Sequence, residues 1–220
     1  MFDLSSMTEY LPAFIEGFIM TAQVSAISII GSFIIGVIVA LMRVSTNKTV
    51  RIISLCYVDL FRNIPFIVLI FFSFYGLPEI GIYIDAFWTG CLTLSVAVGG
   101  YVAETLRAGI INIDKGIIEA AKSFGLSRFK IYQKIIMPIA LTTSVRPLGS
   151  VFINLILTTS ILSAITLNEL TGVSKIIAST TFRPFEVYVF LVFFYGVLTF
   201  ILSGIIALWH RQLNKYTGVA

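Results

Sequence analysis

Residues 119–138 read EAAKSFGLSRFKIYQKIIMP, a stretch that is basic and amphipathic. The segments before and after it are apolar enough to lie in lipid. A polar, helix-like segment between apolar ones predicts a membrane protein with a water-facing helical pair in its middle. What this pair does, and which side of the membrane it faces, decides both the fold and the function.

The composition of the whole chain supports a membrane protein. Of its 220 residues, 58% are hydrophobic and only 12% are charged, whereas a soluble domain carries about 25% charged residues. A folded soluble domain also needs a polar surface, so this deficit predicts an integral membrane protein. The net charge of +4 is weak support for nucleic-acid binding.

Five apolar segments are long enough to cross a bilayer, which takes about 20 residues in a helix. We expect spans at residues 14–42, 55–76, 86–107, 141–167 and 187–209. Because the start of the chain has no basic region, the first apolar segment is expected to be a retained span and not a cleaved signal. Within it, small residues recur at steps of four, which predicts close packing against another helix: Ser28, Ser32, Gly36 and Ala40.

The basic residues gather on one side of this five-span path. Eleven of the fifteen follow the first, third or fifth span: Arg43, Lys48, Arg51, Arg107, Lys115, Lys122, Arg128, Lys130, Lys134, Arg211 and Lys215. The other side has only Lys175 and Arg183, together with most of the acidic residues. Cytoplasmic loops carry an excess of Lys and Arg. The N-terminus is therefore expected outside, the C-terminus in the cytoplasm, and residues 112–138 in a cytoplasmic loop.

This loop has the signals of two short helices. Asp114 is a good N-cap for a helix that opens at Lys115, and Gly125 is suited to end it in a left-handed turn. Ser127 can cap a second helix, which Pro138 is expected to close before the chain re-enters lipid. Each helix carries an apolar stripe that something must cover: Ile117, Ile118, Ala121 and Phe124 in the first, Phe129, Tyr132 and Ile136 in the second.

Three interpretations of the pair follow from its chemistry. It could lie on the acidic inner membrane surface as an amphipathic hairpin. It could close the cytoplasmic end of the bundle as a lid. It could also dock into a groove of a soluble partner. The residue pattern alone leaves these three open.

The spacing in this loop resembles a known family motif. Glu119, Ala120 and Ala121, then Gly125, then Ile135, and finally the pair 137–138 follow the pattern EAA-x3-G-x9-I-x-L-P. That pattern is the EAA loop of bacterial ABC-importer permeases. The one departure is Met137 in place of Leu, a residue of similar size.

Four further stretches are similar to polar amino-acid permeases of the His/Glu/Gln/Arg/opine group. Residues 58–65 resemble their (E/D)xFRxxP, and residues 99–110 resemble GAYxAExxRGGI. Residues 159–171 are similar to their TSL…PELT run, and residues 181–188 read TFRPFEVY, as in the family. The chain is therefore identified as a member of this group, with the all-α, type I ABC-importer permease fold of five transmembrane helices.

The resemblance implies an assembly. In the family, two permease chains lie side by side above two ATPase subunits, and an external binding protein delivers the amino acid. The assembly lies in the bacterial cytoplasmic membrane. On its cytoplasmic side, the loop is a coupling pair of helices seated in a cleft of the ATPase. Carried over to this chain, Glu119, Ala120, Ala121 and Gly125 contact the ATPase, with Pro138 closing the pair. ATP and Mg are used by the partner, and no cofactor or metal is expected on this chain.

Polar residues inside lipid are costly and are candidates for function. Thr158, Thr159 and Ser160 lie about 18 Å from Arg146 along a helix, near mid-membrane, and Asn154 shares a face with Thr158. This face suits the charged groups of an amino acid, although Thr and Ser in spans also bond their own helix carbonyls. Many relatives carry a charged pair where this chain has Leu157-Thr158, so any selection that the pair makes is absent here.

Other polar residues have simpler expectations. Asp59 with Arg62, and Glu104 with Arg107, are three apart and are expected to form ion pairs near the cytoplasmic end. Glu169, after the fourth span, is a weaker candidate for lining an outer vestibule. The two cysteines, Cys56 and Cys91, have no CxxC spacing, and they are expected to be free thiols in apolar segments.

Proteins of other classes remain as alternatives. An ion-coupled secondary transporter usually shows inverted repeats and buried carboxylates, and neither is evident here. A membrane scaffold could use the basic loop to recruit a different partner. An intramembrane enzyme has little support, since there is no HExxH or GxSxG motif. The chain also lacks a Walker A motif, so it is not expected to hydrolyse ATP itself.

Overall fold

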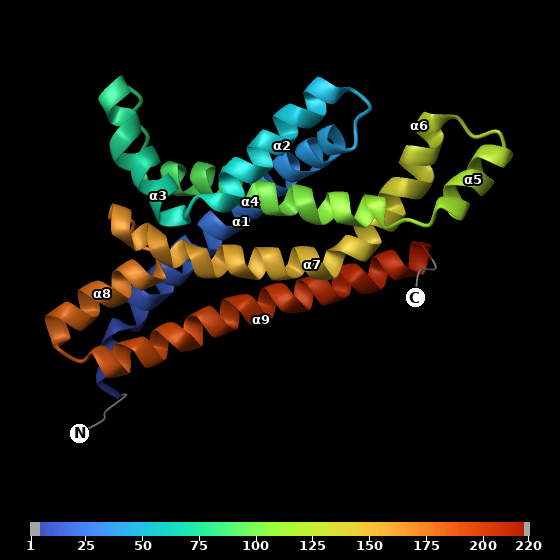
Figure 1. Cartoon of the computed structure of the whole chain (residues 1–220). Coiled ribbons are helices and arrows are strands. Elements are labelled where there is room, and N and C mark those ends of the chain that lie inside the picture. Colours follow the sequence, from blue (N-terminus) through green and yellow to red (C-terminus); the bar gives the residue numbers. More distant parts are fainter. Residues whose placement is uncertain (1–4, 218–220) are drawn as a thin grey trace.

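The computed structural model describes residues 5–217, and every regular element in this part of the chain is a helix (Figure 1). In chain order these are η1 (Ser5–Tyr10), α1 (Leu11–Arg43), α2 (Lys48–Asn63), α3 (Phe66–Phe71), η2 (Phe72–Gly76), η3 (Leu77–Ile80), α4 (Ala86–Ile111), α5 (Lys115–Ser123), α6 (Arg128–Ile131), η4 (Tyr132–Ile136), α7 (Met137–Thr158), η5 (Thr159–Ile165), α8 (Leu170–Thr181) and α9 (Pro184–Thr217).

Four helical stretches are long and apolar enough to cross a membrane: Met7–Arg43, Ala86–Ile111, Phe129–Ile165 and Pro184–Asn214. A fifth crossing is possible if α2 and the helix that follows it count together as one span. The prediction of an all-helical, multi-span membrane protein is confirmed. Helix α8, in the connection before the last span, is an element that the hydropathy pattern did not indicate.

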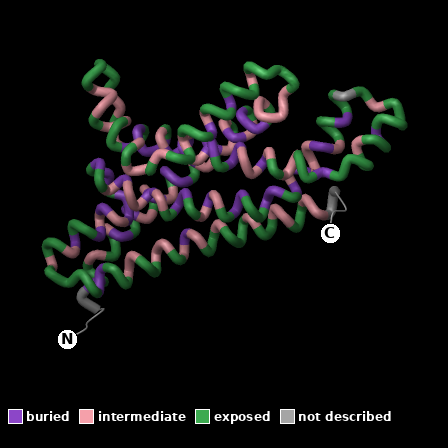
Figure 2. The backbone as a smooth tube through the Cα atoms, viewed as in Figure 1, coloured by how far each residue is buried: buried purple, intermediate pink, exposed green. Residues whose placement is uncertain are grey.

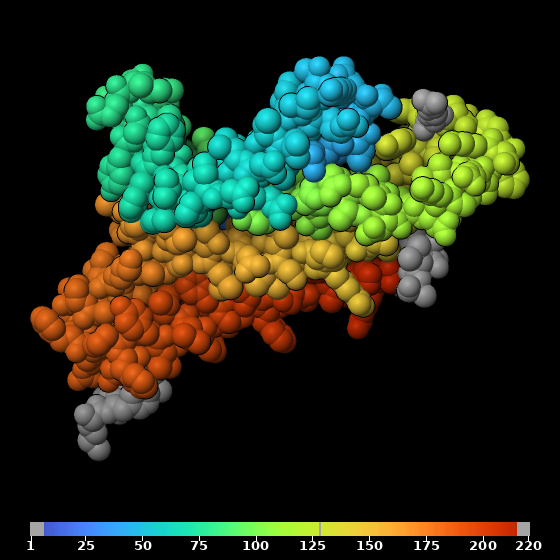
Figure 3. Space-filling view, in the orientation of Figure 1, coloured from blue at the N-terminus to red at the C-terminus, as the bar shows by residue number. Residues whose placement is uncertain are grey.

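The second expected span, residues 55–76, is not a single straight helix. Its two helical parts, Lys48–Asn63 and Phe66–Ile80, are bent by 100°. The break falls at Ile64, which is extended with φ −93° and ψ 130°. Pro65 causes this, because proline has no amide N–H and disfavours helical geometry in the residue before it. As a result α2 and α3 project from the rest of the molecule as separate ridges (Figure 3).

Helix α1 packs along α4. The small-residue stripe of α1 faces this contact, and its members are buried: Ser28, Ser32, Gly36 and Ala40. A Cβ atom at Gly36 would lie 2.3 Å from Cγ1 of Val102 on α4. The two backbones therefore approach as closely as the sequence stripe predicts.

The α5–α6 pair and helix α8 lie at opposite ends of the bundle. Figure 1 shows α5 and α6 at the same end as the C-terminus, while α8 lies at the end where the N-terminus begins. Between the two ends, α4 and α7 contribute many buried residues, whereas α9 is exposed along most of its length (Figure 2). The bundle thus presents one polar helical pair at one end and a long apolar helix on its side.

Candidate functional site: the α5–α6 pair and the cavity between α2, α3, α4 and α7

The first helix of the polar pair begins and ends where the sequence indicates. Oδ1 of Asp114 accepts a hydrogen bond from the amide of Gly116, 2.6 Å away, and caps α5. Gly125 has a φ of +73°, in the left-handed region. Around it, the amide of Gly125 donates to the carbonyl of Lys122 at 2.9 Å. These bonds satisfy the last carbonyls of α5 and turn the chain sharply into α6.

The apolar stripes of the two helices partly cover each other. A buried cluster joins Ala121 of α5 to Ile131 of α6 and to Ile136 and Ala140 beyond it. Two aromatic residues of the predicted stripes lie outside this cluster, because Phe124 is 87% exposed and Phe129 is 73% exposed. Ile117 and Tyr132 are also exposed, at 43% and 36%, so part of each stripe remains uncovered, most of all at this aromatic tip.

Pro138 does not close the pair. It is the second residue of α7, and the chain runs helically from Phe129 to Ile165. The turn just before it, Tyr132–Ile136, is a wider π-helix. Proline cannot donate to the carbonyl four residues back, and its ring would collide with that carbonyl, which explains the widened turn. The second helix of the pair is thus continuous with the fourth span.

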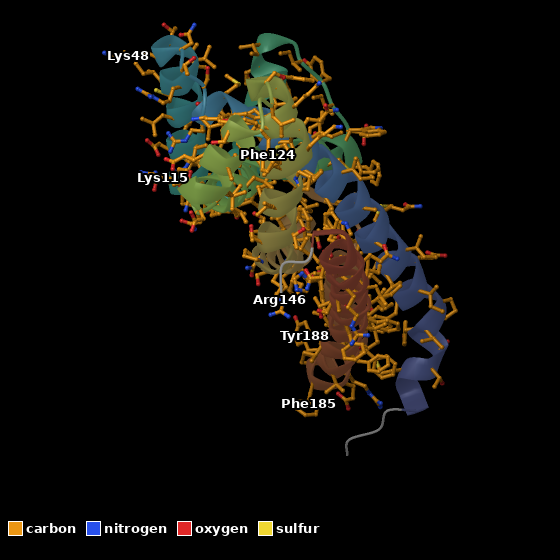
Figure 4. All side chains as sticks on the ribbon, turned by 90° about the vertical axis from the view of Figure 1, so that its right-hand side faces the viewer. Lys48, Lys115, Phe124, Arg146, Phe185 and Tyr188 are labelled. Carbon is orange, nitrogen blue, oxygen red and sulfur yellow. The ribbon has the colours of Figure 1, made fainter. Side chains whose placement is uncertain are left out.

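The motif residues divide between the inside and the outside of the pair. Ala121 is 4% exposed and belongs to the buried cluster. Glu119 and Ala120 are exposed on α5. An exposed carboxylate and a small side chain beside an aromatic tip form a surface that a groove in a partner could accommodate. Phe124 stands at this tip and is labelled in Figure 4.

A pocket of about 350 Å³, here called the central cavity, opens to the surface of the chain, since Asn154 and Tyr101 in its lining are exposed. Helices α2, α3, α4 and α7 all contribute to its walls. Most of the lining is apolar or aromatic, and the polar groups come from Asn154, Thr158 and Tyr101. A mainly apolar cavity with a few polar groups is the usual form of a small-molecule site.

The four polar residues that the sequence indicates for the substrate path do not share one site in the structure. Asn154 and Thr158 line the cavity, and the Thr158 hydroxyl donates to the Asn154 carbonyl at 2.7 Å. Thr159 is buried and bonds the carbonyl of Ile156. Ser160 instead lines a groove toward α9. The structure thus brings Asn154 and Thr158 together and leaves the other two apart from the cavity.

A second cleft, of about 400 Å³, continues from the cavity toward the end that carries α5 and α6. Tyr101 borders both. Its ring lies under the guanidinium of Arg62, 5.2 Å from the ring centroid, and its hydroxyl donates to the Arg62 carbonyl at 3.2 Å. Tyr101 and Arg62 therefore separate the two spaces. Sequence reasoning missed Tyr101, although it stands inside the GAYxAE-like stretch.

One of the two expected ion pairs forms. Arg107 donates to Glu104 through both Nε and Nη2, with 2.9 Å for the Nε bond. Arg43, at the end of α1, adds a contact of 3.5 Å to the same carboxylate and ties α1 to α4. Within residues 5–217 no ion pair joins Asp59 and Arg62; Arg62 lies over Tyr101 instead, and Asp59 is exposed. The three-residue spacing allowed that pair, but the aromatic ring offers the guanidinium an alternative.

Glu169 does not line an open vestibule, because it is fully buried. It caps α8, accepting hydrogen bonds from the amides of Thr171 and Gly172 at 3.0 and 2.9 Å. The hydroxyl of Tyr195 on α9 also donates to it at 2.9 Å. Burial raises the pKa of the Glu169 carboxyl above its ordinary value, and these hydrogen bonds act against that rise. The residue therefore links α8 to α9, a role that its place after the fourth span did not indicate.

Comparison with known proteins agrees with this architecture. The model of the family described as "Binding-protein-dependent transport system inner membrane component" matches residues 32–215. The probable glutamine ABC transporter permease GlnM of Bacillus subtilis (strain 168) is 34% identical over 213 residues, covering 97% of this chain and 99% of that protein. The glutamine transport system permease GlnP of Escherichia coli (strain K12) is 30% identical, with 97% and 98% covered.

Solved structures give the same result. A crystal structure described as an amino acid ABC transporter with histidines has a TM-score of 0.89 and 33% sequence identity, and the match covers 96% of this chain and 99% of that one. The inward-facing MetNI methionine ABC transporter has a TM-score of 0.78 at 19% identity, a likeness of fold. These matches agree with the presence of helices long enough to span the membrane. We conclude that this multi-pass inner membrane protein belongs to the family of binding-protein-dependent transport system inner membrane components.

Proposed function

We propose that this chain is the transmembrane subunit of an ATP-driven importer, which takes up a polar amino acid delivered by an external binding protein. The observation that carries the proposal is the α5–α6 pair. It is a capped, sharply turned helical unit with an exposed aromatic tip, and its second helix runs directly into a span. Force applied to the tip would reach the walls of the central cavity through α7.

In the proposed assembly, two permease chains stand above two ATPase subunits in the inner membrane. ATP and Mg are held by the ATPases, and Glu119, Ala120 and Gly125 lie at the contact, with Ala121 supporting it from within. The N-terminus is outside and the C-terminus is cytoplasmic. The position of α5 and α6 at the same end as the C-terminus supports this orientation (Figure 1). The whole chain, residues 1–220, is one permease domain, and the bent α2–α3 pair supplies its fifth crossing.

The amino acid would pass through the central cavity. Asn154 and Thr158 offer an amide and a hydroxyl to its carboxylate and ammonium groups. Tyr101 and Arg62 stand between this cavity and the cleft on the cytoplasmic side, where they would restrict passage until the helices move. Thr159, Ser160 and Glu169 do not touch the substrate in this proposal: the two hydroxyls donate to carbonyls three residues back, and Glu169 links α8 to α9.

Reconstitution tests the function directly. The chain is purified with a co-expressed ATPase, placed in proteoliposomes, and assayed for uptake of radiolabelled polar amino acids. Uptake is expected only when ATP is inside and the binding protein is outside. Uptake driven by an ion gradient alone would indicate a secondary transporter, and no uptake of any kind would favour a scaffold.

A further inference from the structure

A groove between α7 and α9 lies on the other side of α7 from the central cavity. It has a volume of about 360 Å³ and is formed by residues 146–153 of α7 and 203–211 of α9. At about 100° per residue, Asn154 and Thr158 lie about 80–140° around α7 from Arg146 and Ile153, and no residue lines both spaces. The groove is therefore separate from the proposed substrate path.

The groove is polar at one end and apolar at the other. Arg146, His210 and Arg211 lie at the end where α9 reaches the C-terminal side of the bundle. Ile153 lies seven residues deeper on α7, about 10 Å along the helix, and Ile206 and Ala207 cover the groove from α9. A cationic mouth above an apolar slot is complementary to a phospholipid, whose phosphate is polar and whose chains are not.

The positive charges at the mouth have no countercharge from the described chain. Neither Arg146 nor Arg211 forms an ion pair within residues 5–217, and no acidic residue lines the groove. Arg146 is labelled in Figure 4. Two guanidinium groups without a carboxylate partner leave room for an anion, and guanidinium geometry matches the oxygens of a phosphate.

His210 adds a buried ring nitrogen that has no hydrogen-bond partner among the described residues. Its Nε2 lies 3.4 Å from Nδ2 of Asn214, while Nδ1 is buried and without a partner. If Asn214 donates to Nε2, the neutral ring carries its proton on Nδ1. A buried donor of this kind is costly to leave unpaired, and a phosphate oxygen in the groove would accept from it.

The surroundings favour lipid as the source of the phosphate. α9 exposes large apolar side chains along its length, among them Val192 at 73% and Phe200 at 82%. Such a face belongs against acyl chains. Basic pockets between helices on the cytoplasmic side commonly bind anionic headgroups, and the proposed orientation puts this end in that leaflet.

From the charge, the polarity gradient and the apolar flank, we propose that the α7–α9 groove binds one anionic phospholipid of the inner leaflet, with its phosphate held by Arg146, Arg211 and His210. Bound there, the lipid would brace α7 against α9. Because α7 is continuous with the α5–α6 pair, the site would affect the stability of the helix that transmits the proposed coupling.

The test uses the full chain in a neutral detergent, titrated with phosphatidylglycerol or phosphatidylcholine, with bound lipid counted by native mass spectrometry. One saturable phosphatidylglycerol per chain is expected, and phosphatidylcholine should bind far more weakly. The double variant Arg146→Gln/Arg211→Gln should raise the Kd for phosphatidylglycerol about 30-fold, as expected for two basic residues at a membrane surface. Its size-exclusion profile checks that it remains folded.

Two matched variants sharpen the test. Lys48→Gln/Arg51→Gln removes two exposed charges of α2, away from the groove, and should leave the Kd unchanged. Ala207→Trp fills the groove without changing charge, and it should weaken binding as the double variant does. Equal losses in the α2 control, equal binding of phosphatidylcholine, or no saturable lipid would overturn the proposal. So would full competition by inorganic phosphate, which would show a site for a soluble anion.

Discussion

The amide of Leu126 donates a hydrogen bond to the carbonyl of Ala121, with 3.3 Å between nitrogen and oxygen. This bond spans the turn at Gly125 and forms only when the glycine is left-handed. It joins a buried residue of the EAA motif to the turn that leads into α6. The angle between α5 and α6 is therefore set by the backbone of the motif itself, which explains why the pattern fixes a glycine four residues after its second alanine.

Gly125→Arg should leave the protein inserted in the membrane but uncouple uptake from ATP hydrolysis. A side chain at φ +73° costs about 1–2 kcal/mol, and the bulk would stand at the proposed docking surface. Uptake and ATP hydrolysis are measured together in proteoliposomes. Gly81→Arg is the control, because Gly81 has a φ of +85° with open space around it, in the turn before α4. Normal transport by the Gly125 variant would refute the docking assignment.

Asn154→Leu/Thr158→Val should lower amino-acid uptake by about tenfold while ATP hydrolysis by the assembled complex continues. Each residue loses a polar group that faces the cavity, and a lost substrate hydrogen bond is worth about 1–3 kcal/mol. Thr199→Val is the control, since its hydroxyl also bonds a carbonyl four residues back but lies on α9. If both variants reduce uptake equally, the cavity has no special role.

Glu169→Ala should lower the stability of the folded chain by about 2–4 kcal/mol. The variant leaves two amides of α8 and the Tyr195 hydroxyl without their acceptor in a buried place. Thermal unfolding in detergent measures the loss. Glu79→Ala removes an exposed carboxylate and should change little. A melting temperature as high as that of the wild type would mean that Glu169 does not hold α8 to α9.

The pH dependence of stability gives a separate test of Glu169. Its folded-state pKa is raised by burial, so the folded state holds this proton more tightly than the unfolded chain does. Its contribution to stability is then fully present below the ordinary Glu pKa of about 4.3 and is lost as the pH rises through the raised value. Melting temperatures measured across this window should fall more steeply for the wild type than for Glu169→Gln. Parallel profiles would exclude the shift.

The sequence predicts the helical pair well because its signals are local. Asp114 as a cap and Gly125 as a turn act on the residues beside them, and both do so in the structure. Hydropathy likewise finds the long spans, since a membrane crossing needs only length and apolar composition. The small-residue stripe of α1 is buried for the same kind of reason, as a periodicity within one helix.

What the sequence did not indicate depends on contacts between distant segments. Glu169 looks like a residue of an open connection, and only the fold brings Tyr195, 26 residues away, to its carboxylate. Arg62 had a carboxylate at helical spacing, but the fold places the ring of Tyr101 beneath it. Pro138 carries a stop signal, yet the π-turn before it lets the helix continue. For Glu169 and Arg62 tertiary packing decided between two locally allowed arrangements, whereas at Pro138 a local widening of the helix did so.

Labelling at position 124 tests most directly whether the α5–α6 pair is a cytoplasmic docking element. Phe124→Cys is made in a Cys56→Ser/Cys91→Ser background, because Cys56 is itself exposed. Phe182→Cys, equally exposed at 87% but near the start of α9, is the control. A membrane-impermeant thiol reagent should label the Phe124→Cys variant only in inside-out vesicles, and the ATPase should both protect the new thiol and cross-link to it. Labelling of that variant only from the exterior, or an ATPase that neither protects nor cross-links it, would contradict the account.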